Sequence, residues 1–265
     1  DPLWSRGLGD VYKRQDQRQA TPRRNGAPAS IRREIEGSLR RLGVERIYLY
    51  QMHWPAGDGT PLEAYWQELL DLKQAGKVRA VGLSNHNLAQ LQDAEALGHV
   101  ESLQPPFSAI QRSAAADLIP WCAQNGTGVI VYSPMQSGLL SGGFTAERAQ
   151  ALRQDDWRSR NAEFKAPNLA RNLALAEALK PIAERHGATQ AAVAIAWTLA
   201  WPGVTGAIVG ARNAAQVDGV VGAAELELDA DDMARIANAI ELTGAGFGPL
   251  RPEDDSGALP ANLFA

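Results

Sequence analysis

Short apolar segments alternate with helical segments along this chain, and that alternation limits the folds it can adopt. Five apolar segments have the length of buried strands, at residues 44–55, 77–84, 102–110, 128–133 and 204–209. Helical patterns lie between them, and no two are joined by a turn of hairpin length. Such strands predict a parallel sheet covered by helices, either an open doubly wound sheet or a closed (β/α) barrel.

Helical periodicity predicts the segments between the strands. In the first helix, apolar residues recur at helical spacing from Ile31 to Leu42, Ser30 is the expected cap, and Gly43 ends it. A Gly/Arg-rich loop is expected over residues 134–167. The other expected helices are residues 61–76, 87–97, 115–125, 169–186, 189–201, 213–224 (capped by Asn213) and 229–240 (capped by Asp229).

Polar residues gather directly after the predicted strands, at His53, Ser84–Asn85, Gln104, Tyr132–Ser133 and 210–213. Active groups at the carboxyl ends of strands are expected in both architectures. No G-x-G-x-x-G follows any strand, which disfavours the open dinucleotide-binding sheet. These polar positions are therefore the candidate functional residues.

The ends of the chain lack these patterns. Residues 1–29 show neither strand alternation nor a sustained helical period, and we interpret them as a disordered or foreign N-terminal tail. Residues 30–242 are expected to form the folded body. Residues 243–265, rich in Gly and Pro, are expected to form an irregular C-terminal tail.

Composition narrows the class of protein. Hydrophobic residues make up 45% of the 265 residues, which allows a large core and excludes a disordered chain. Cys122 is the only cysteine, so an intrachain disulfide and a cysteine-rich zinc site are excluded, and we predict no metal. The longest apolar run, residues 191–201, is too short to span a membrane, and we expect no secretory signal. We therefore expect a cytoplasmic protein.

The charge is distributed unevenly along the chain. The net charge of −4 argues against a protein that coats nucleic acid. Residues 1–46, however, hold 11 Lys/Arg against 6 Asp/Glu. Such a basic segment suits a nucleic-acid or membrane-surface tail, or else a solvated tail with one Arg-rich helix face. We adopt the second interpretation and expect neither a nucleic acid nor a membrane as partner.

Five sequence blocks together resemble the aldo-keto reductases, over about residues 29–240. The blocks, in chain order, are RREIEGSLRRLGVERIYLYQMHWP, KVRAVGLSNHN, LQPPFSAIQR, GVIVYSPMQSGLLSGGF and GVTGAIVGARNAAQV. The resemblance implies a (β/α)8 barrel of the TIM type, of which this chain would hold about five βα units, strands 4–8. It also implies an oxidoreductase that uses NADP(H) to reduce aldehydes and ketones, with a small-molecule carbonyl compound as substrate.

The resemblance assigns roles to residues around the strand ends. His53 matches the histidine of the family's catalytic tetrad, which orients the substrate carbonyl, and Trp54 is expected to contribute to the substrate pocket. Ser84, Asn85 and Gln104 resemble the side chains that hold the nicotinamide carboxamide. Side chains that offer both donors and acceptors can fix which face of the ring is presented.

The remaining assignments concern the rest of the cofactor. Tyr132 resembles the aromatic residue on which the nicotinamide stacks. The following loop resembles the one that covers the pyrophosphate, with the amides of Ser137 and Gly138 expected to be accessible to phosphate oxygens. The adenosine site, including the 2′-phosphate, is implied at the last strand. The loop residues are Ser133, Pro134, Met135, Ser137, Gly138 and Leu139, and the adenosine-site residues are Gly210, Arg212 and Gln216.

The sequence departs from the family pattern in one large respect. The family's tetrad Asp, Tyr and Lys lie in strand–helix units before the one that ends in His53, and we match none of them to residues 1–29. Each βαβ step takes about 30 residues. We therefore expect an incomplete barrel with impaired turnover, which self-associates through its open edges.

Two other interpretations stay open. The chain could be a non-catalytic NADP(H)-binding interaction or sensor module. It could also be another (β/α) barrel that binds a phosphorylated metabolite after residues 204–209, although it lacks the paired carboxylates or metal ligands that such enzymes need.

Overall fold

The computed structural model of the chain describes residues 24–252, which divide into two compact units. In its described part, unit 1 comprises residues 24–105 and 124–128, and unit 2 comprises residues 106–123 and 129–252. No helix within the described residues is long and apolar enough to cross a membrane.

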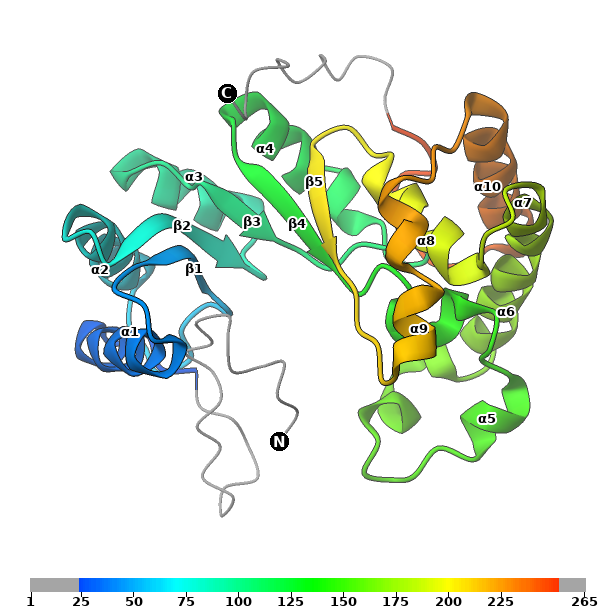
Figure 1. Cartoon of the computed structure of the whole chain (residues 1–265), viewed down its shortest axis with the longest axis horizontal. Helices are drawn as coiled ribbons and strands as arrows, with labels where there is room; N and C mark the ends of the chain where they lie inside the picture. The colour runs from blue at the N-terminus through cyan, green and yellow to red at the C-terminus, as the bar shows by residue number, and fades with distance from the viewer. Residues whose placement is uncertain (1–23, 253–265) are drawn as a thin grey trace. The chain divides into compact units, whose positions relative to one another are not determined.

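Unit 1 is built from three helix–strand pairs in chain order. Its elements are α1 (Pro28–Leu42), β1 (Ile47–Met52), α2 (Leu62–Gln74), β2 (Val78–Ser84), α3 (Leu88–Leu97) and β3 (Ser102–Gln104). Both strand pairs, β1 with β2 and β2 with β3, are parallel, and Ser84 lies opposite Gln104. In Figure 1, helix α2 lies between α1 and α3, and it packs against both of them and against β2.

The core of unit 1 lies between these helices and the strands. Ile31 and Ile35 of α1, one helical turn apart, are fully buried, as is Trp66 of α2. Burying such side chains stabilises the fold by about 1.5–3 kcal/mol each. Strands β2 and β3 approach closely at Gly82, where a Cβ atom would lie 2.4 Å from the carbonyl oxygen of Ser102.

Unit 2 contains the remaining two strands and most of the helices. Strand β4 (Gly128–Tyr132), whose first residue falls in unit 1, pairs in parallel with β5 (Val204–Ile208). The helices are α4 (Leu118–Asn125, with its last two residues in unit 1), α5 (Ala146–Gln150), α6 (Asn168–Ala178), α7 (Lys180–Arg185), α8 (Gln190–Leu199), α9 (Ala214–Asp218) and α10 (Ala230–Thr243). The 3-10 turns are η2 (Ser113–Ala115), η3 (Gln136–Ser141), η4 (Trp157–Arg160), η5 (Ala162–Phe164) and η6 (Val221–Ala224).

Helix α8 forms the centre of the unit 2 core, with every residue from Ala191 to Thr198 buried. Its Trp197 stacks on Phe107 with 5.4 Å between ring centroids, and Trp201 meets both rings edge-on. Such aromatic pairs add about 0.5–1.5 kcal/mol beyond the area that they bury.

A buried arginine ties the C-terminal segment of unit 2 to the residues after β3. The guanidinium of Arg112, which is 2% exposed, donates to the backbone carbonyls of Ala109, Ala245, Gly248 and Pro249. The amide of Arg112 also donates to the carbonyl oxygen of Phe247 at 3.0 Å. Burial lowers the pKa of Arg112 to about 10, so the side chain stays charged at neutral pH.

The start of the fold differs from the prediction. Helix α1 begins at Pro28 with Ala27 as its cap, so the predicted cap at Ser30 is wrong. Proline is preorganised for the first helical position because its φ is fixed and its missing N–H would have no partner there. Arg24 and Gly26 already contact the 57–58 loop, through Gly57 N–H to the Arg24 carbonyl at 2.8 Å and Gly26 N–H to Asp58 Oδ2 at 3.1 Å. The boundary at residue 29 is therefore too late, and residues 1–23 lie outside the described residues.

Three other predicted elements are shorter or divided. Strand β3 stops at Gln104, because Pro105 and Pro106 have no N–H for the ladder. The predicted helix 169–186 is divided between α6 and α7 just before Pro181. The segment 213–224 divides into α9 and η6. Of the predicted C-terminal tail, residues 253–265 lie outside the described residues.

Candidate functional site

The carboxyl ends of the three parallel strands of unit 1 bring four predicted residues together. The side-chain amide of Asn85 donates to the backbone oxygen of His53 at 2.9 Å and to Ser84 Oγ at 3.1 Å. The Ser84 hydroxyl donates in turn to the carbonyl oxygen of Gln104 at 2.7 Å. The ends of β1, β2 and β3 are thus joined by side chains as well as by the strand ladder.

Asn85 has a left-handed backbone conformation, with φ at 61°. Asparagine tolerates this region better than most residues because its short polar side chain can hydrogen-bond locally. The side chain of Asn85 does so here, through its bond to Ser84 Oγ. The turn after β2 therefore fixes the direction of this amide group.

Two residues that the sequence did not single out extend this network. The amide of Gln104 donates to Gln51 Oε1 at 2.8 Å, and Gln51 donates to Ser102 Oγ at 2.9 Å. Gln51 is the one amide side chain of the apolar strand β1. Ser102 and Gln104 are two apart on β3, so their side chains share a face. A polar residue inside an apolar strand was the signal that could have identified Gln51.

A buried tyrosine–histidine pair lies behind the turn and was also missed. Tyr65 of α2 has its hydroxyl 2.7 Å from His86 Nε2, and His86 Nδ1 lies 2.9 Å from the carbonyl oxygen of Ser84. Burial lowers the pKa of His86 to about 4 and raises the pKa of Tyr65 to about 12. Both side chains therefore stay neutral over the usual working range of pH.

The predicted catalytic and substrate residues lie next to each other after β1. His53 and Trp54 are half-buried, with 6.2 Å between their ring centroids. The guanidinium of Arg24 lies over the ring of Trp54 at 4.1 Å from its centroid. Because that cation–π contact covers one face of the indole, a substrate in contact with Trp54 would meet the opposite face or the ring edge.

In unit 2, the loop after β4 has an unusual backbone. Ser133, Gln136, Ser137 and Gly138 all have positive φ, of 57°, 45°, 53° and 101°. Runs of such residues can turn backbone amides toward one side and form a concave anion site. The amide of Gly138, however, donates to the Met135 carbonyl at 3.1 Å. The prediction that this amide is accessible to phosphate is therefore wrong in this structure.

Four other residues predicted for this part of the cofactor site differ in burial. Pro134 and Leu139 are buried, and Met135 is partly buried and packs against the cluster of Ala192, Ile195 and Ala223, so these side chains belong to the core. Tyr132, at the end of β4, is half-buried, and burial raises its pKa.

The residues predicted for the adenosine end follow β5 and are exposed. Gln216 Oε1 accepts from the amide of Arg212 at 2.7 Å, and Asn213 caps α9 by accepting from the amide of Gln216 at 3.0 Å. Arg212 forms no ion pair with any residue of the described range, and a Cβ atom at Gly210 would meet no atom within 4 Å.

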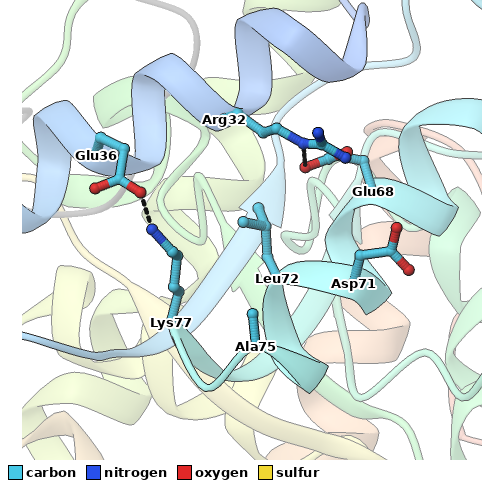
Figure 2. Close-up of a pocket in the computed structure, with 7 residues that line it drawn as sticks. All are labelled: Arg32, Glu36, Glu68, Asp71, Leu72, Ala75 and Lys77. Carbon is cyan, nitrogen blue, oxygen red and sulfur yellow. Dashed lines mark hydrogen bonds and ion pairs between the residues drawn. The ribbon is translucent and has the colours of Figure 1, made fainter.

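The lining of the cleft shown in Figure 2 includes none of the predicted site residues. It has a volume of about 260 Å³ and lies between α1 and α2. Arg32 bonds to Glu68 at 2.6 Å and Lys77 bonds to Glu36, so both cations of the cleft have carboxylate partners. Its remaining lining residues are Asp71, Leu72 and Ala75.

Known proteins resemble this chain over most of its length. The sequence model of the Aldo/keto reductase family matches residues 12–241, beginning earlier than the predicted resemblance at residue 29. Aldo-keto reductase YhdN of Bacillus subtilis is 30% identical over 231 residues, which cover 87% of this chain and 68% of the relative. The NADH-specific methylglyoxal reductase of Escherichia coli is 30% identical over 244 residues, covering 90% of this chain and 73% of the relative.

A solved structure shows the same fold. The glycerol dehydrogenase of Gluconobacter oxydans superposes with a TM-score of 0.80 at 32% identity, covering 92% of this chain and 72% of that one. The fold is thus α/β of the (β/α)8 barrel type, with five parallel strands within the described residues.

Proposed function

Because the chain belongs to the aldo/keto reductase family, we propose that it binds NADP(H) and interconverts a small carbonyl compound and its alcohol. The observation that carries this proposal is the network joining His53, Asn85, Ser84 and Gln104 at the strand ends. It brings amide and hydroxyl groups next to the backbone of the candidate catalytic histidine, which supports recognition of a carboxamide near a reacting carbonyl.

Each unit by itself contains predicted residues that suit one part of a nicotinamide dinucleotide. In unit 1, Ser84, Asn85 and Gln104 would hold the carboxamide. In unit 2, Tyr132 would support the nicotinamide ring, and the positive-φ backbone at Ser133, Gln136 and Ser137 suits a pyrophosphate. When bound, the nucleotide supplies or accepts the hydride.

The phosphate end of the cofactor is assigned to the segment after β5. Gly210 leaves open space for a close approach, and Arg212 offers a guanidinium that no described carboxylate neutralises. Gln216 holds the Arg212 backbone and so shapes this segment. A guanidinium suits the planar, bidentate recognition of a 2′-phosphate.

His53 is proposed to orient the substrate carbonyl by a hydrogen bond, while Asn85 holds its backbone. We assign no tetrad Asp, Tyr or Lys within residues 24–252. A general acid typically contributes 10²- to 10⁴-fold to the rate. Turnover that relies on the described residues alone would therefore be slow, and cofactor binding has to be measured separately from turnover.

The difference between NADPH and NADH binding gives the most direct test of the role proposed for Arg212. Exchange of Arg212 for alanine should weaken NADPH binding about fivefold to tenfold, as loss of a charge-assisted contact of about 1 kcal/mol would do, and should leave NADH binding nearly unchanged. The control is Arg153→Ala, since Arg153 is an exposed arginine elsewhere in unit 2, paired with Asp155. Titration of the intrinsic tryptophan fluorescence with each nucleotide measures both constants.

Equal losses for the two nucleotides would refute the phosphate assignment. Tighter binding of NADH by the unaltered protein would instead assign NAD(H), the cofactor in the printed name of the Escherichia coli relative.

The substrate class is tested by turnover. The names of two relatives mention methylglyoxal and glycerol, so the first assays are NADPH oxidation with methylglyoxal and NADP⁺ reduction with glycerol. We expect small aldehydes or ketones as substrates and a cytoplasmic location. Saturable nucleotide binding without turnover of any carbonyl compound would favour the alternative, a non-catalytic NADP(H)-binding module.

A further inference from the structure

The buried pair of Tyr65 and His86 is connected to the site through one backbone atom. His86 is 2% exposed and Tyr65 is also 2% exposed, and their side chains meet at 2.7 Å. The other ring nitrogen of His86 lies 2.9 Å from the Ser84 carbonyl. The pair thus links helix α2 to the residue that starts the Ser84–Asn85 turn.

The chemistry of the partners determines the proton positions. A carbonyl oxygen can only accept, so His86 Nδ1 carries the hydrogen and donates it to Ser84. In a neutral imidazole Nε2 then accepts, and the Tyr65 hydroxyl donates to it. Burial disfavours the charged ring, which agrees with the neutral form. The result is a one-directional chain from the Tyr65 hydroxyl through His86 to the Ser84 carbonyl.

This chain acts on a part of the backbone that depends on local hydrogen bonds. The Ser84 carbonyl belongs to the peptide plane that leads into Asn85, whose φ is 61°. Asparagine tolerates this region better than most residues, but only where local hydrogen bonds hold it there. Holding the Ser84 carbonyl therefore restrains the rotation that would let the turn relax, and with it the amide that reaches His53.

We propose that His86 and Tyr65 are positioning residues, which hold the Ser84–Asn85 turn in the conformation that receives the nicotinamide carboxamide. The inference rests on the proposed function, because the turn is the assigned carboxamide site. It adds a buried support that contacts neither cofactor nor substrate and acts through the backbone of Ser84.

The packing role of the pair does not require these residue types. Replacing both partners of a buried hydrogen bond by apolar groups of similar shape is close to neutral for stability. The polar pair is instead needed because its hydrogen bond fixes the orientation of the Ser84 carbonyl.

The experiment compares two ligands that share only the adenosine end. NADPH contains the carboxamide, and adenosine 2′,5′-bisphosphate lacks the nicotinamide altogether. In the full chain, His86→Leu removes both bonds of the ring and Tyr65→Phe removes only the outer bond. The expected result is NADPH binding weakened about tenfold by His86→Leu and about threefold by Tyr65→Phe, with binding of the bisphosphate within twofold of the original.

Two further variants separate positioning from stability. His86→Asn retains a side-chain amide near the position of Nδ1, so it should restore most of the NADPH affinity that His86→Leu loses. Thr127→Val is the matched control, since Thr127 is buried in unit 1 and donates to the Val100 carbonyl at 2.7 Å, outside the turn. It should destabilise unit 1 without changing the ratio of the two affinities.

Parallel losses for both ligands, or unchanged NADPH binding in His86→Leu and Tyr65→Phe, would overturn the inference. Tyr65→Phe is nearly isosteric and decides the matter if His86→Leu does not fold. An unaltered protein that binds neither ligand would refute the proposed function itself, and the inference with it.

Discussion

Acidification should destabilise this protein through His86. Burial lowers its pKa from 6.5 to about 4, whereas the unfolded chain returns it to the ordinary value. The titratable group in contact with its ring, Tyr65, has a pKa raised to about 12 and stays protonated throughout. As the pH falls below about 6.5, the unfolded state binds a proton that the folded state excludes, so the free energy of unfolding decreases until the pH reaches about 4.

The magnitude follows from the two pKa values. Between about pH 7 and pH 4.5, linkage predicts a loss of about 2 kcal/mol from this one side chain. Urea unfolding followed by tryptophan fluorescence measures the free energy at each pH. The His86→Asn variant, which cannot titrate at this position, should show a shallower pH dependence by the same amount, while all other groups cancel in the comparison.

The absolute stability of the variant at neutral pH does not enter this test, because only the change with pH is compared. If the two proteins lose the same free energy of unfolding over this range, to within about 0.5 kcal/mol, His86 is not held neutral by burial. That result would also contradict the assignment of Nε2 as the acceptor of the Tyr65 hydroxyl, although Nδ1 would still donate to the Ser84 carbonyl.

Two predictions concern the stability of unit 2. Gly246→Ala should lower the free energy of unfolding by about 3 kcal/mol, since a Cβ atom would lie 1.8 Å from the Ile110 oxygen at a φ of 62°. The control is Gly244→Ala, which has the same φ but no atom closer than 4.0 Å and should cost only about 1 kcal/mol. Equal costs for the two variants would exclude the clash. Asp229→Ala should cost about 1 kcal/mol, because its side chain accepts from the amide of Asp232 at the start of α10; urea unfolding measures both, and an unchanged midpoint for Asp229→Ala would show that the cap contributes nothing.

Local signals in the sequence predicted the elements well where one residue sets the boundary. Asn213 and Asp229 are the caps of their helices, as predicted. The five predicted strands are all present within the described residues. Ser30 failed as a cap because a serine three residues into a helix looks the same in sequence as one before it. Pro28 was the better signal.

The site was predicted only in part, for a physical reason. Strand ends identified His53, Ser84, Asn85 and Gln104, because parallel strands place their carboxyl ends at one edge. The contact between Tyr65 and His86 joins a helix to a turn 21 residues away. No local period encodes such a contact, since it depends on how α2 packs on the sheet. The amide of Gly138 was misjudged because a glycine indicates freedom of φ but not which carbonyl its N–H will meet.

Arg112 should slow local unfolding at the C-terminal end of the described residues. Its guanidinium is compensated by the carbonyl dipoles of Ala245, Gly248 and Pro249, together with its near neighbour Ala109. If the segment from Ala245 to Pro249 unfolded alone, the guanidinium of Arg112 would stay buried without these carbonyl partners and without water. Burying an unpaired charge in this way costs free energy. Fraying at this end is therefore coupled to a larger opening that admits solvent to the guanidinium, and the amide hydrogen of Phe247 should exchange as slowly as those of the interior.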